Sequence, residues 1–97
     1  MTNHPNRGKT YWKLHPRRFQ NEYTVGVATT KEDAEQYQAE GFSRIEREVA
    51  LHYLSRRPDN GEQLYVAAQL NGRDIEEMMP RFDSRYDFAR QIRRGEI

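Results

Sequence analysis

The sequence predicts a small α+β domain in which one sheet of three or four mainly antiparallel strands packs against helices. Two observations lead to this fold class. The chain has 97 residues, which is enough for one domain with a modest core. Some segments have apolar residues at every second position, as strands do, and others have them at helical spacing. These segments follow one another in the order β-β-α-β-α-β-α-α. We assign residues 9–97 to the domain and expect residues 1–8, which have turn formers and no periodicity, to be a mobile N-terminal arm.

The first strand is expected at residues 10–14, which are rich in aromatic and β-forming side chains. Alternation along a strand puts Trp12 and Leu14 on one face and Tyr11 and Lys13 on the other. A tryptophan in such a strand belongs more often to a core than to an exposed platform, so we expect Trp12 in the core.

A second strand is expected at residues 23–28, where apolar and small residues alternate. Two strands that follow each other closely in sequence usually pair as an antiparallel hairpin. Residues 15–22, which contain a proline and two adjacent arginines, therefore predict a long basic hairpin tip.

The helix that follows has the clearest boundaries in the chain. Thr30 is a suitable N-cap, and Asp33 three residues later completes a variant of the capping box. Gly41 can adopt the left-handed conformation of a residue just past a helix end, and Phe42 then falls where a Schellman motif brings it against Tyr37. We therefore predict a helix from residue 31 to about residue 40.

Residues 42–45 admit two interpretations. Ser43 and Glu46 match a capping box, which would start a helix at residue 44. A short strand would instead return beside residues 23–28 through a right-handed crossover. We favour the short strand.

Residues 46–56 predict a helix under either interpretation. Its expected apolar stripe consists of Val49, Ala50, Tyr53 and Leu54. This stripe places Arg47 and Arg56 outside the core. His52 lies one turn after Glu48, so we expect a surface histidine paired with that carboxylate.

Residues 63–70 are apolar on both faces and predict a central strand. The dipeptide at residues 71–72 is a strong turn signal, but the sequence after it lacks strand alternation and offers Asp74 as an N-cap. We therefore expect a short helix there. Met78 and Met79 are expected to fill gaps in the core rather than to form an interface patch.

The last helix is expected to begin after Asp83 or Ser84 and to end at Gly95. Its predicted buried residues are Phe88, Ala89 and Ile92. Arginines in its last turn complement the negative end of the helix dipole.

Composition excludes several classes of protein. Cysteine is absent, and the sequence has neither a signal-peptide run nor a membrane-spanning run, so we expect a cytoplasmic protein without disulfides or membrane association. His4, His15 and His52 lack the spacing of metal ligands. Serine nucleophile motifs, phosphate-binding glycine loops and HExxH are missing. We therefore expect no enzymatic activity, catalytic residue, cofactor or metal.

The first 21 residues form a basic pole, because they carry five basic groups and no acid in a chain of net charge +1. Three of the sixteen basic residues of the chain are lysines and thirteen are arginines, which favours planar contacts to carboxylate or phosphate groups. The candidate binding residues are Arg7, Lys9, Lys13, His15, Arg17, Arg18 and Phe19.

Two classes of function fit these residues. The first is a small non-enzymatic binding protein that acts through protein–protein contact at the loop of residues 15–20 and at exposed Arg and Tyr side chains, which are favoured at interface hot spots. The second is a nucleic-acid-binding protein whose basic N-terminal residues contact phosphates while Tyr11, Trp12 and Phe19 stack on bases. Self-association would be another way for so small a core to gain buried surface.

A cysteine-free, Arg-rich chain of this size without enzymatic motifs resembles many phage or mobile-element accessory proteins. Some proteins of that kind inhibit host complexes such as CRISPR effectors. The resemblance, which is one of size and composition, implies an inhibitor of a host complex as the most specific form of the first function.

Overall fold

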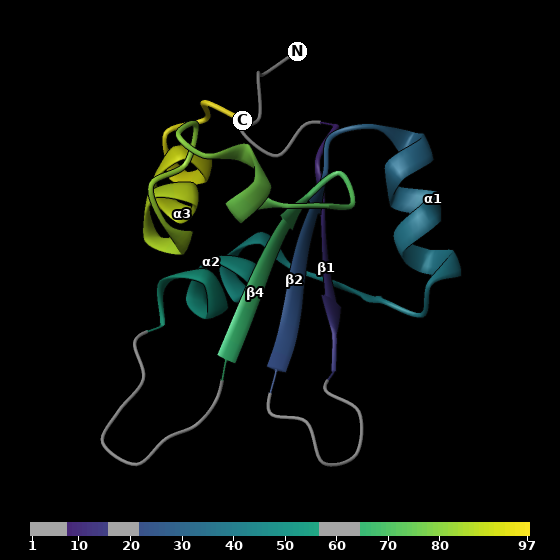
Figure 1. The fold of residues 1–97 in the computed structure, drawn as a ribbon. Helices are drawn as coiled ribbons and strands as arrows, with labels where there is room; N and C mark the ends of the chain where they lie inside the picture. The colour runs from purple at the N-terminus through teal and green to yellow at the C-terminus, as the bar shows by residue number, and fades with distance from the viewer. Residues whose placement is uncertain (1–7, 16–21, 57–64) are drawn as a thin grey trace.

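The computed structural model describes residues 8–15, 22–56 and 65–97, and in this part of the chain helices pack on a five-stranded mixed sheet (Figure 1). The strands are β1 (Thr10–Leu14), β2 (Glu22–Ala28), β3 (Ser43–Ile45), β4 (Tyr65–Leu70) and β5 (Arg73–Asp74). The helices are α1 (Lys31–Ala39), α2 (Arg47–Ser55), the 3-10 helix η1 (Ile75–Met78) and α3 (Arg85–Arg93). The α+β class and most of the element order agree with the prediction. Residues 1–7 of the expected arm and residues 16–21 of the expected hairpin tip lie outside the described residues.

The sheet has the strand order β3-β1-β2-β4-β5. β1 and β2 pair antiparallel, with Tyr11 opposite Val27, as the hairpin prediction requires. β2 and β4 run parallel, with Val25 opposite Ala68. The prediction of three or four mainly antiparallel strands is therefore wrong in the strand number and in this central pair. A parallel pair needs a long crossover connection, and α1, β3 and α2 supply it between β2 and β4.

Strand β3 exists as predicted, but its neighbour differs from the prediction. It pairs antiparallel with β1, with Ile45 opposite Tyr11, and it forms one edge of the sheet. The predicted position beside residues 23–28 is wrong, because β2 already has β1 on one side and β4 on the other. A strand can have only two neighbours in a sheet, so β3 takes the free side of β1.

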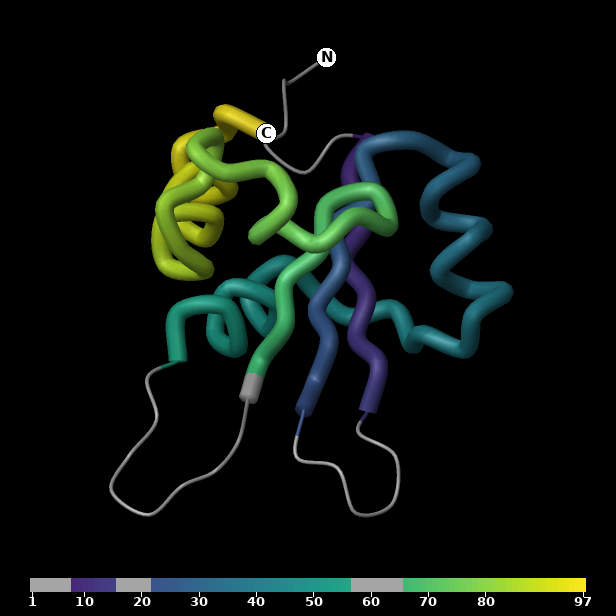
Figure 2. The backbone as a smooth tube through the Cα atoms, in the orientation of Figure 1, coloured from purple at the N-terminus to yellow at the C-terminus, as the bar shows by residue number. Residues whose placement is uncertain are grey.

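Both faces of the sheet are covered, and each face has its own apolar cluster. The main cluster lies between the sheet and α2, η1 and α3, and its members include Tyr11, Leu54, Leu70, Phe82, Phe88 and Ile92. The smaller cluster lies under α1 and contains Trp12, Ala28, Tyr37 and Phe42. Figure 2 shows the backbone of α1 on the other side of the strands from α2 and α3. Trp12 is therefore a core residue, as predicted.

The boundaries of α1 agree with the sequence prediction. The hydroxyl of Thr30 accepts a hydrogen bond from the backbone N–H of Asp33 at 3.1 Å. Gly41 has φ +92°, and the backbone N–H of Phe42 donates to the carbonyl of Tyr37 at 3.0 Å, which is the outer hydrogen bond of a Schellman motif. The ring centroids of Tyr37 and Phe42 lie 4.7 Å apart. Local signals are thus sufficient to position this helix.

Helix α2 is rotated relative to the prediction. Val49 is 38% exposed, whereas Leu51 is 4% exposed and joins Ala50 and Leu54 in the core. The predicted stripe is wrong at Val49 because α2 packs against α3 as well as against the sheet, which widens its buried face on that side. Arg47, expected outside, is only partly exposed.

Strand β4 lies in the interior of the sheet as predicted, and a two-residue turn follows it. Asn71 and Gly72 have φ +51° and +82°, as a type I′ hairpin turn requires. Strand β5 then pairs with the end of β4, so the expectation that no strand follows the turn is wrong for Arg73 and Asp74. The predicted N-cap is confirmed, because the Asp74 carboxylate accepts from the N–H of Glu76 and η1 begins there.

Met78 and Met79 lie in different environments. Met78 packs against the main core, whereas Met79 is 55% exposed, so the expectation of gap filling is wrong for Met79. Helix α3 begins after Ser84 as predicted, with Phe88, Ala89 and Ile92 buried. Within the described residues, the structure contains no helix long and apolar enough to cross a membrane.

Candidate binding site

Five aromatic and cationic side chains gather on the α2 face of the sheet, at the end where β1 finishes and β2 begins. They are Lys13, His15, Tyr23, His52 and Tyr53, and we call them the Tyr23 cluster. Lys13 lies in β1, and His15 follows directly after the last residue of that strand. The β1–β2 register, with Leu14 opposite Thr24, then brings Tyr23 beside them.

Tyr23 and Tyr53 form the centre of the cluster, with ring centroids 5.5 Å apart. The Lys13 ammonium lies 4.6 Å from the centroid of Tyr53 and 5.6 Å from that of Tyr23, and it donates a hydrogen bond to the Tyr53 hydroxyl at 3.3 Å. His15 meets Tyr23 edge-on at 5.8 Å, and His52 meets Tyr53 edge-on at 5.7 Å. Cation–π attraction and ring contacts therefore hold side chains from two strands and one helix in one group.

The cluster is accessible to a partner. Lys13, Tyr23 and Tyr53 are partly exposed, and His15 and His52 are exposed. Among the described residues Lys13 has no ion-pair partner, so its ammonium retains donors for a carboxylate or phosphate of a partner. Tyrosine offers a large, rigid contact surface together with a polar tip. The arrangement fits molecular recognition.

The structure separates the predicted binding residues. Lys13 and His15 belong to the Tyr23 cluster, whereas Lys9 lies before the other end of β1, about 13 Å from Lys13 at about 3.3 Å per residue. The predicted binding residues Arg7, Arg17, Arg18 and Phe19 lie outside the described residues. Within the described part of the chain, the basic residues of the N-terminal segment therefore do not form one continuous surface.

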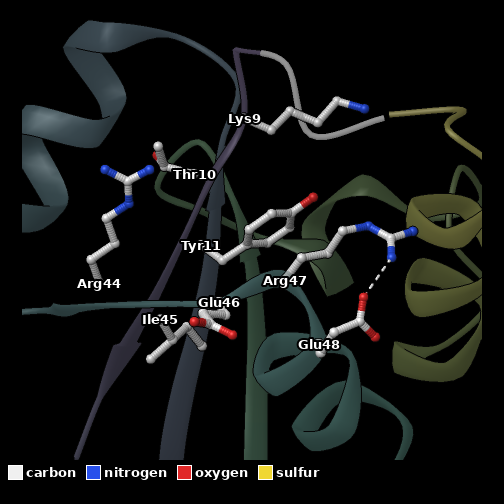
Figure 3. Close-up of a pocket in the computed structure, with 8 residues that line it drawn as sticks. All are labelled: Lys9, Thr10, Tyr11, Arg44, Ile45, Glu46, Arg47 and Glu48. Atoms are coloured by element: carbon white, nitrogen blue, oxygen red, sulfur yellow. Dashed lines mark hydrogen bonds and ion pairs between the residues drawn. The ribbon is translucent and has the colours of Figure 1, made fainter. Parts of the chain in front are cut away.

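Lys9 borders a hollow of about 370 Å³ between the start of β1 and the start of α2 (Figure 3). Arg47 lines this hollow, pairs with Glu48 at 3.1 Å and donates to the carbonyl of Ile92 at 3.4 Å. Burial raises the pKa of the Tyr11 hydroxyl, and the positive charge and hydrogen bond of Arg47 oppose that shift. Arg47 thus stabilises the contacts of α2 with β1 and α3, and we assign this hollow a structural role.

Tyr23, His52 and Tyr53 were not identified as site residues from the sequence. The helical spacing predicts Tyr53 in the core stripe, and Tyr53 does pack against the main cluster while part of it stays exposed. The predicted pair of His52 with Glu48 is wrong, because Glu48 pairs with Arg47. Their proximity to Lys13 arises from contacts between residues 40 positions apart, for which the sequence contains no local signal. The position of Tyr23 directly after the basic loop was the one indication available.

Comparison with models of protein families, with curated proteins and with solved structures finds no match to this chain. Within the described residues, no group of three or more His, Asp or Glu side chains is arranged to hold a metal ion. Fold and site together define a small α+β domain with an accessible surface of aromatic and cationic side chains.

Proposed function

We propose that this chain is a small non-enzymatic binding protein that acts through protein–protein contact at the Tyr23 cluster. The observation that carries the proposal is the group formed by Lys13, Tyr23 and Tyr53, which is partly exposed and held together by contacts between separate elements. Tyrosines and cations in a fixed arrangement are typical of interface centres, because they lose little conformational entropy when a partner binds.

The alternative function, nucleic-acid binding through the basic N-terminal segment, has less support. It requires Tyr11 and Trp12 to stack on bases, but these side chains are 3% and 7% exposed and belong to the two cores. It also requires Lys9 and Lys13 to contact phosphates, although the Lys13 ammonium already contacts two tyrosine rings.

Inhibition of a host complex by a phage or mobile-element protein is the most specific form of the proposal. A rigid surface on a small scaffold can block a larger surface on a partner without any chemistry of its own. Such an inhibitor would act in the cytoplasm of the host cell. Self-association through the same cluster is a second form of protein contact, and sedimentation at several concentrations distinguishes it from partner binding.

The test is affinity capture from bacterial lysates with matched charge variants. Lys13→Glu, His15→Glu and His52→Glu together place three carboxylates in the cluster, whereas Lys31→Glu, Gln38→Glu and Ala39→Glu place three carboxylates at exposed positions of α1 on the other face and change the net charge equally. We expect the wild type and the α1 variant to capture the same protein and the cluster variant to lose it while its melting curve still shows a folded protein. Equal capture by both variants contradicts the proposal.

Salt dependence tests the alternative. If five basic residues of the N-terminal segment contact phosphates, the log–log slope of duplex affinity against salt is about −4, at roughly 0.9 per phosphate. Replacing Arg17 and Arg18 with Ala should then reduce the slope by about 2. Tight binding with this slope, together with no captured protein, would favour the nucleic-acid function over the protein-binding function.

A further inference from the structure

Among the described strands, β5 leaves part of the edge of β4 on its side without a partner. Strand β5 pairs only with Gln69 and Leu70 of β4. The backbone N–H of Asn71 donates to Val27 of β2 at 2.8 Å, and successive residues of a strand direct their backbone groups to opposite sides. The backbone groups of Val66 and Ala68 therefore point away from β2, toward an edge that no described strand occupies.

A groove of about 570 Å³ lies along this edge. It is lined by Val66, Ala67 and Ala68 of β4 and by Met79 and Phe82, which follow η1 in the sequence. Phe82 is buried in the main core, but Met79 is 55% exposed and is one of two exposed large hydrophobic residues in the described part of the chain. The groove thus combines an open strand edge with an unburied methionine, a side chain that adapts to varied partners.

The charge of the groove is negative. Three carboxylates line it, from Asp74, Glu76 and Asp83, and none has an ion-pair partner among the described residues. The cation of the groove, Arg85, donates through its Nη1 to three backbone carbonyls at the end of α2 at 2.9, 2.9 and 2.7 Å. Its hydrogen bonds are directed to the protein itself, so the acids determine which ligand the groove attracts.

We propose that this groove binds an extended, basic segment of another protein, which adds to β4 as a further strand. Backbone hydrogen bonds to Val66 and Ala68 would supply affinity, and side chains at alternate positions would contact the groove. Lys or Arg side chains complement the three carboxylates, and an apolar side chain covers Met79. A second copy of this chain fits less well, because a symmetric pairing of two grooves would bring like charges together.

This inference goes beyond the proposed function, because it concerns a different surface and shares no residue with the Tyr23 cluster. The two are tested separately, since charge reversal at the cluster leaves the groove unchanged.

The experiment measures binding of short synthetic peptides by fluorescence anisotropy and by amide chemical shifts. The probe is an eight-residue peptide of alternating Lys and Val, and the controls are the Glu/Val peptide and a Lys/Val peptide with a central proline. The proline peptide keeps the charge but lacks a backbone donor and the extended pairing. We expect binding of the Lys/Val peptide alone, with amide shifts concentrated at Val66 and Ala68.

Charge variants of the protein separate groove binding from general attraction. Glu76→Lys with Asp83→Lys should weaken binding of the Lys/Val peptide at least about tenfold, because the acids of the groove are reversed. Glu32→Lys with Glu35→Lys on α1 makes the same change in net charge and should alter affinity less than about twofold.

Three results would overturn the proposal. One is the absence of binding up to roughly 1 mM peptide, a concentration that detects even weak complexes. Another is equal weakening by the groove and α1 variants, which would show that only net charge matters. The third is a concentration-dependent dimer that loses stability on Met79→Ser, which would assign the groove to a second copy of this chain.

Discussion

The ring of Tyr37 lies over Gly26 and occupies the space that a side chain at residue 26 would need. The Tyr37 hydroxyl accepts a hydrogen bond from the backbone N–H of Gly72 at 2.8 Å, and its ring packs against Trp12 and Phe42. One buried side chain of α1 thus contacts β1, β2 and the turn between β4 and β5. The glycine in β2 makes this contact possible, because any other residue would displace the ring.

Gly26→Ala should destabilise the protein by about 1–3 kcal/mol, because the added methyl group overpacks the site under Tyr37. Thermal or denaturant unfolding measures the loss. Tyr37→Leu removes the ring that the methyl group would meet, so Gly26→Ala should cost little in that background. Equal costs in the two backgrounds would contradict the packing explanation.

Tyr37→Phe should change how stability depends on alkaline pH. Burial raises the pKa of Tyr37 to about 12, while the Gly72 hydrogen bond lowers it and Asp33 and Glu40 raise it further. Between pH 10 and 12 the unfolded tyrosine loses its proton and the folded one keeps it, so the stability of the wild type falls with rising pH. The Tyr37→Phe variant lacks this contribution, so its free energy of unfolding should fall less steeply between pH 10 and 12.

Below pH 10 the tyrosine keeps its proton in both the folded and the unfolded state, so the hydrogen bond of its hydroxyl decides which protein is more stable. There Tyr37→Phe should be less stable than the wild type by about 1 kcal/mol, because the Gly72 N–H loses its acceptor. Unfolding curves at pH 8, 10 and 12 give both comparisons. Parallel pH profiles for the two proteins would show that the hydroxyl is not held protonated by the fold.

Gly41→Ala should cost about 1–2 kcal/mol, because Gly41 has φ +92° and an L-residue is strained there. For a domain of this size each kcal/mol lowers Tm by about 4–8 °C, which calorimetry detects. Gln38→Ala, an exposed change in the same turn, should stay within about 0.5 kcal/mol of the wild type. A Tm unaffected by Gly41→Ala would mean that α1 does not end in a left-handed residue.

Arg85→Ala should destabilise the contact between α2 and α3. The Arg85 guanidinium donates to the carbonyls of Tyr53, Leu54 and Arg56, which are at the negative end of α2. Hydrogen bonds from a charged group contribute about 1.5–3 kcal/mol, so the free energy of unfolding should fall by that order. Arg85→Lys keeps a cation at the helix end and should restore part of the loss. If lysine is no better than alanine, the positive charge contributes nothing there.

Element type and helix boundaries could be predicted where a few neighbouring residues decide them. Thr30 with Asp33 starts α1, Gly41 with Phe42 ends it, and Ser84 starts α3. The signals are local hydrogen bonds and left-handed glycines, which act within one turn of the chain. Alternation likewise predicted that Trp12 and Tyr11 lie on opposite faces of β1.

Which strands are neighbours could not be predicted, because strand order depends on contacts far apart in sequence. β3 pairs with the free side of β1, and β4 pairs with the free side of β2. The exposed side of α2 could not be predicted for the same reason. Packing of α2 against α3 buries Leu51, while Val49 stays exposed. The Tyr23 cluster depends on the same long-range contacts.

The sequence by itself determined that this is a cysteine-free α+β protein with capped helices, and that the charge of its N-terminal segment is positive. Only the tertiary structure decided that Lys13 meets Tyr23 and Tyr53, that Tyr37 covers Gly26, and that β5 pairs with only the last two residues of β4, beside an acidic groove. Local sequence specifies backbone conformation through caps and alternation. The choice among distant partners depends on which packing buries the most apolar surface, and that is a property of the whole fold.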